Sequence, residues 1–94
     1  MQTPHELAEI RMRLSAEYAR DSEKLGDILA VKAKAWEAVR AGCTSDKQAD
    51  KKWDSSDHGI TEMRLRLSLK AKEKEMSSIS TFLRVLDAEA RNLM

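Results

Sequence analysis

The sequence predicts an all-α protein: an antiparallel hairpin of two long helices, coiled-coil-like, that assembles into a helical bundle. Apolar residues recur at steps of three and four along both halves of the 94-residue chain, which is the spacing of one helix face. Charged residues make up 35% of the chain and aromatic residues 4%, a composition that favours long helices over a sandwich, barrel or α/β domain.

The small size of the chain favours self-association. We expect one helical-hairpin domain over residues 1–94, and a domain of this size buries only about 60–65% of its unfolded surface even when it is globular. A lone hairpin buries less. We therefore expect a homo-oligomer, with a dimer that forms a four-helix bundle as its simplest form.

The first helix is predicted over residues 4–40. Thr3 is a good N-cap, Pro4 suits the first helical position, and Glu6 completes a capping box. A single apolar stripe follows, interrupted by two charged residues. The stripe consists of Leu7, Ile10, Leu14, Tyr18, Leu25, Ile28, Trp36 and Val39, and the interruptions are Asp21 and Lys32.

Two glycines lie inside and at the end of this helix. Gly26 lies inside it, where glycine costs about 1 kcal/mol relative to alanine, so we expect a close contact or a bend there. Gly42 is expected to adopt a left-handed cap and to open a turn over residues 41–45.

The second helix is predicted over residues 46–94, with Ser45 and Gln48 as its capping box. We favour one continuous helix that kinks near Gly59. The alternative is a short helix, a turn and a new helix capped by Ser56 or Asp57, because the segment before Gly59 is poor in helix formers.

The second helix carries two apolar faces. One is a coiled-coil seam broken by Lys72, and the other passes through Ile60, Met63 and Leu67. The two residues that separate Leu67 from Leu69 turn a helix by about 200°, so the faces point in opposite directions. We predict an oligomer interface on the seam residues Leu65, Leu69, Met76, Ile79, Leu83, Leu86 and Leu93.

Large apolar side chains outside the seam are candidates for binding another protein. Trp36, Trp53 and Met63 are the candidates, since tryptophan is enriched at interface hot spots and methionine adapts to a partner. The alternative is that both tryptophans serve as packing anchors.

A local basic segment is the candidate nucleic-acid surface. Its residues are Arg64, Arg66, Lys70, Lys72 and Lys74. Arg66, Lys70 and Lys74 are spaced four residues apart and would line one edge of a helix, where they could contact phosphates. Trp53 would then stack on an exposed base. The alternative is a solvated flank that pairs with nearby acids, and the net charge of the whole chain is only +1.

Candidate chemistry is sparse. Asp54, Asp57 and His58 would share one side of a continuous helix and could hold a divalent metal, but we favour their role as capping or solvated residues of a helix junction. Cys43 with His58 is the remaining thiol candidate. The sequence lacks phosphate-loop, zinc and nucleophile-elbow motifs, so we expect no enzyme, no metal and no cofactor.

The expected location is the cytoplasm, and no membrane partner is expected. Cys43 is the only cysteine, the first residues lack the pattern of a signal peptide, and the longest aliphatic run, residues 28–31, is far below the about 20 residues that span a bilayer.

About half of the chain resembles small helical accessory proteins of tailed bacteriophages and prophages. The similar segments are residues 45–54, Gly59, residues 62–63, residues 70–76 and residues 89–92. The resemblance implies a phage setting, in which such proteins serve DNA recombination and replication or bind and inhibit host defence proteins. We therefore expect a non-enzymatic, self-associating protein-binding module, with a DNA-binding accessory factor as the alternative.

Overall fold

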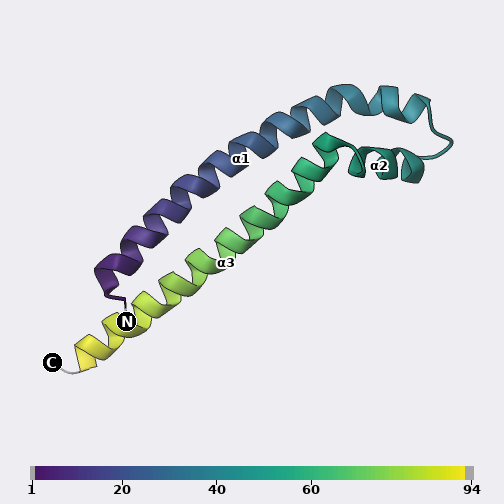
Figure 1. Ribbon diagram of the computed structural model, residues 1–94. Helices are drawn as coiled ribbons and strands as arrows, with labels where there is room; N and C mark the ends of the chain where they lie inside the picture. The colour runs from purple at the N-terminus through teal and green to yellow at the C-terminus, as the bar shows by residue number, and fades with distance from the viewer. Residues whose placement is uncertain (1, 93–94) are drawn as a thin grey trace.

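The computed structural model describes residues 2–92, which form three α-helices: α1 (Pro4–Ala41), α2 (Asp46–Asp54) and α3 (Asp57–Asn92). The two long helices, α1 and α3, run antiparallel along each other, and the short α2 turns the chain back at one end (Figure 1). The predicted all-α hairpin is confirmed at this level.

The molecule is a rod, 68 Å long and 20 by 19 Å across. Its radius of gyration is 19.9 Å, whereas a compact domain of the same length would have about 12 Å. Each long helix therefore has only one helical neighbour over most of its length, so most of its circumference faces solvent.

Helix α1 begins as predicted and ends one residue beyond the predicted end. The Thr3 hydroxyl accepts a hydrogen bond from the Glu6 amide at 3.2 Å. The expected left-handed cap at Gly42 is wrong, because its φ is −89°. The turn is instead closed by Arg40, whose guanidinium donates to the Cys43 carbonyl at 2.8 Å and pairs with Asp46 at 2.6 Å.

The prediction of one continuous second helix is wrong, and the alternative with two helices is correct. The break lies at Ser55 and Ser56, before Gly59. The Ser56 hydroxyl donates to the last-turn carbonyl of Trp53 and accepts the Gly59 amide at 3.1 Å. One short polar side chain thus satisfies backbone groups at the end of α2 and the start of α3, which makes the break stable.

Gly59 is required for the close approach of these two helices. A Cβ atom at this position would lie 2.7 Å from the carbonyl carbon of Trp53 and 2.9 Å from the Cα of Asp54, and closer still to the Trp53 carbonyl oxygen. Gly59 therefore allows the backbones of α2 and α3 to pack closely, and it does not kink a continuous helix. A Cβ atom at Gly26, by contrast, would meet no atom of another element within 4 Å, so Gly26 is not a close-contact point.

The core is divided between the two ends of the rod. At the end that holds the termini, Leu7, Leu14 and Ile79 are buried. At the other end, Ala49 and Trp53 of α2 are buried beneath the long helices. Partly buried Ile10, Met76 and Leu83 extend the first cluster. None of the helices in residues 2–92 contains an apolar stretch of the length that spans a bilayer.

The two inner glycines give a matched test of the junction. Gly59→Ala should lower the free energy of unfolding by about 2–3 kcal/mol, because the methyl group overlaps backbone that cannot move without separating α2 from α3. Gly26→Ala should raise it by about 0.5–1 kcal/mol through helix propensity alone. Urea unfolding followed by circular dichroism measures both, and equal effects of the two substitutions would contradict the close approach at Gly59.

Candidate functional site

Two charged clusters cross the interface between α1 and α3 at the positions where the apolar stripes are interrupted. In the first, the Lys72 ammonium lies 2.5 Å from an Asp21 carboxylate oxygen, which also accepts the Ser68 hydroxyl at 3.0 Å. The side chains of Lys72 and Asp21 are only 20% and 15% exposed. Lys72 therefore faces α1 and not the solvent.

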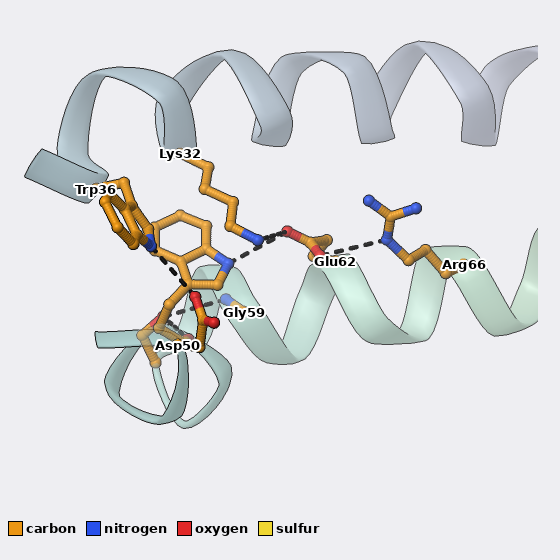
Figure 2. A network of polar contacts seen from close by, with 8 residues as sticks. Lys32, Trp36, Asp50, Gly59, Glu62 and Arg66 are labelled. Carbon is orange, nitrogen blue, oxygen red and sulfur yellow. Dashed lines mark hydrogen bonds and ion pairs between the residues drawn. The ribbon is translucent and has the colours of Figure 1, made fainter. Parts of the chain in front are cut away.

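The second cluster centres on Glu62, which is 9% exposed. Its carboxylate accepts the Trp53 indole N–H at 3.2 Å and lies 3.3 Å from the Lys32 ammonium and 3.2 Å from the Arg66 guanidinium. Figure 2 shows Lys32 reaching down from α1 and Arg66 reaching back along α3 to this one carboxylate. All three helices thus meet at Glu62.

The two tryptophans join this cluster to α2. Lys32 also lies over the Trp53 ring, 5.6 Å from its centroid, in a cation–π arrangement. The Trp36 indole N–H donates to Asp50 of α2 at 3.3 Å (Figure 2). Trp53 is 4% exposed, so stacking on a nucleic-acid base would require this end of the hairpin to open. Trp53 thus packs within the chain, Trp36 is half-buried, and their role in binding a partner stays a prediction.

The charged clusters shift the pKa values of their carboxyl groups. The hydrogen bonds from Lys72 and then Ser68 lower the pKa of Asp21. Burial disfavours the charged form of Glu62, but the bonds from Trp53, Lys32 and Arg66 together outweigh it, so the pKa of Glu62 is also lowered.

A groove of about 590 Å³, which we call the α1–α3 groove, lies along one side of the hairpin and extends from Glu62 and Arg66 to Tyr18 and Glu73. Leu25 and Leu69 contribute apolar surface, Met63 and Leu67 line it from α3, and charges of both signs surround it. The Tyr18 hydroxyl donates to Glu73 at 2.5 Å at one end, and this bond raises the pKa of Tyr18. The charged and polar lining residues are Tyr18, Asp54, Glu62, Arg66, Lys70 and Glu73.

The largest exposed apolar side chains of α3 form what we call the outer stripe: Met63, Leu67, Phe82 and Val85. They are 55%, 61%, 45% and 48% exposed. Helical spacing places Leu67 and Val85 opposite the α1-facing residues of α3. The sequence indicated Met63 and Leu67, but Phe82 and Val85 were missed because polar residues separate them from the first pair.

The predicted seam residues face the other way. Ile79 is buried and Leu65, Leu69, Met76, Leu83 and Leu86 are half-buried. Of these, Met76, Ile79 and Leu83 belong to the cluster that packs with Leu7 and Leu14 of α1. Leu93 lies outside the described residues. The seam thus closes the hairpin within one chain, and its role between chains stays a prediction.

The structure separates the five basic candidates. Lys72 is directed to Asp21 and Arg66 is paired with Glu62. Arg64, Lys70 and Lys74 are exposed, and no ion pair with them is seen within residues 2–92. Three of the five cations therefore remain exposed to solvent.

The residues considered for metal or thiol chemistry are not assembled. Asp54 ends α2 whereas Asp57 and His58 begin α3, and the His58 ring is stacked on Trp53 with centroids 6.1 Å apart. Among residues 2–92 no group of three His, Cys, Asp or Glu residues is placed to hold a metal ion. Cys43 is a half-buried free thiol in the α1–α2 turn.

No protein-family model, curated protein or solved structure matches this chain. Its function is therefore inferred from its own surfaces.

The charged clusters should make stability depend on pH. Because the pKa values of Asp21 and Glu62 are lowered in the folded state, the unfolded chain takes up protons first as the pH falls. We expect the free energy of unfolding to be constant from pH 7 to about pH 5 and to decline below that as both groups protonate.

Urea titrations at several pH values measure this decline. The Asp21→Asn, Glu62→Gln double variant should be less stable at pH 7 and should show a shallower decline. An equally steep decline in the double variant would assign the pH dependence to other carboxyl groups.

Proposed function

We propose that this protein is a non-catalytic helical interaction module that associates with itself through the outer stripe and engages another protein. The observation that carries the proposal is the exposure of four large apolar side chains of α3, with Leu67 at 61%. Clusters of exposed apolar side chains mark interaction surfaces more often than chance.

The surface area of the chain supports self-association. The accessible surface is 7260 Å², whereas a compact monomer of this size would expose about 5,500 Å². The excess is larger than the about 800 Å² that each partner contributes to an interface of standard size. A second hairpin laid against α3 would give it the second helical neighbour that the rod lacks.

The α1–α3 groove supports binding of a further protein. It combines apolar walls with a rim that carries both charge signs, which is the composition that receives an amphipathic helix. The setting we propose is the one that the resemblance implies: a phage-type accessory factor in the cytoplasm of a bacterial host that engages or inhibits a host or phage protein.

Self-association is tested by light scattering after size exclusion. We expect the wild-type chain to have twice the mass of one chain, and Met63→Glu with Leu67→Glu to raise the dissociation constant about tenfold or more, because two charges would be buried at the contact. Met12→Glu with Val31→Glu is the matched control, since both residues are exposed on α1 and the pair adds the same charge. A monomeric wild-type protein at high micromolar concentration would refute this function.

Nucleic-acid binding is the second candidate, favoured by the three exposed cations Arg64, Lys70 and Lys74. If the protein binds nucleic acid, a labelled single-stranded oligonucleotide should bind at low salt. Replacing all three residues with glutamine should then reduce the magnitude of the slope of log K against log salt concentration by about 2. The control neutralises the exposed Arg13, Arg20 and Lys34 of α1, which removes the same charge. Fluorescence anisotropy measures the binding of the oligonucleotide. If no binding is seen in about 50 mM salt, this candidate is excluded.

A further inference from the structure

The α1–α3 groove is bounded at both ends by residues of the chain itself. At one end the Tyr18 hydroxyl of α1 donates to Glu73 of α3, and at the other end Asp54, the last residue of α2, lines the groove. The lining residues Glu62 and Glu73 are separated by about 16 Å, or three turns, along α3. A helix presents the apolar side chains that anchor it in a groove over about two turns, so the groove has room for one such segment.

Two cations on one wall of the groove can take an additional carboxylate. Arg66 and Lys70 are both exposed and stand four residues apart on α3, so their Cβ atoms lie about 6 Å from each other. Arg66 contacts Glu62 through its Nε atom, and its two terminal nitrogens point away from that carboxylate (Figure 2). Lys70 makes no ion pair within residues 2–92. One carboxylate from outside the chain could therefore contact both cations.

The carboxyl groups of the groove that lack an ion pair lie toward its two ends. Asp54 and Glu73 line the groove, and neither forms an ion pair with another described residue. The charges along the groove therefore follow the order negative, positive, negative, with Arg66 and Lys70 in the middle. An amphipathic helix with an acidic residue near its middle and basic residues toward its ends complements this order.

Two wall residues of the groove also belong to the outer stripe. Met63 and Leu67 line the groove and are the most exposed apolar side chains of α3. A helix in the groove would cover them, and so would a second copy of the chain packed on the outer stripe. One side chain cannot be enclosed by two partners at the same time, so the two contacts compete.

We propose that the α1–α3 groove binds one amphipathic helix of a partner protein, that a carboxylate of this helix lies between Arg66 and Lys70, and that its binding displaces the second copy of the chain. This inference rests on the proposed function and specifies its partner and its regulation. A ligand that binds only the single chain weakens self-association as the concentration of the ligand rises.

Light scattering of the full chain with a synthetic peptide tests the competition. The probe is an amphipathic peptide of about 15 residues, with leucine at helical spacing, one glutamate beside the leucine stripe near the middle, and lysine near both ends. At a free peptide concentration about ten times its dissociation constant, the dissociation constant of the dimer should rise about a hundredfold, because both chains must release peptide before they pair. A peptide that binds without changing the dissociation constant of the dimer would overturn the competition.

Charge exchange tests the place of the carboxylate. Lysine in place of the peptide glutamate, or Lys70→Glu in the protein, should each weaken peptide binding about fivefold or more, and the two changes together should recover part of the loss. Lys74→Glu is the matched control, because Lys74 is exposed on the next turn of α3 and does not line the groove. Equal effects of Lys70→Glu and Lys74→Glu would overturn the placement.

Fluorescence anisotropy of the labelled peptide measures these affinities, at a protein concentration below the dissociation constant of the dimer. Circular dichroism of each variant checks that its helices are retained. A dimeric wild-type protein that does not bind the peptide at about 1 mM would overturn this inference while the proposed self-association stands. A monomeric wild-type protein that binds the peptide with the Lys70 dependence would remove self-association and the competition, while the groove site stands.

Discussion

The register between α1 and α3 is the constraint on which the rest of this structure depends, and two charged clusters set it. An apolar seam with steps of three and four looks similar after a slip of one heptad, about 10 Å along the helix. The contacts of Lys72 with Asp21 and of Lys32 with Glu62 exist in only one register. A slip would leave these mostly buried charges without partners, which is costly in free energy.

The register also determines how the chain turns at the end of the hairpin. Glu62 lies within the second turn of α3 and accepts the indole N–H of Trp53 from α2, so the same carboxylate that aligns the long helices holds the short one. The Ser56 hydroxyl and the absent side chain of Gly59 then allow α2 to end against the start of α3. The turn and the register therefore stabilise each other.

A hairpin of two long helices cannot enclose its own apolar residues. Leu7, Leu14 and Ile79 form a core at one end, but Leu67 and Phe82 face solvent because no third long helix covers α3 within residues 2–92. The exposed surface follows from the architecture and not from a local irregularity. The rod therefore offers for contact the outer stripe and the α1–α3 groove, which share Met63 and Leu67, and its described residues hold no assembled metal-binding group.

The sequence by itself determined the helical hairpin, the start of α1 and the presence of two apolar faces, because capping and helical periodicity act over only a few residues. Thr3 and Glu6 marked the start of α1, and Met63 and Leu67 were separable from the seam by spacing alone. Only the tertiary structure decided what the interruptions do: Asp21, Lys32 and Lys72 break the stripes in the sequence but pair across the hairpin. It also decided the break at Ser56, because helix continuity through residues 54–59 was closely balanced and the packing of Trp53 over Glu62 favours two helices. Such pairings join residues 30 to 51 positions apart, and local patterns carry no information on which distant partner a charge will meet.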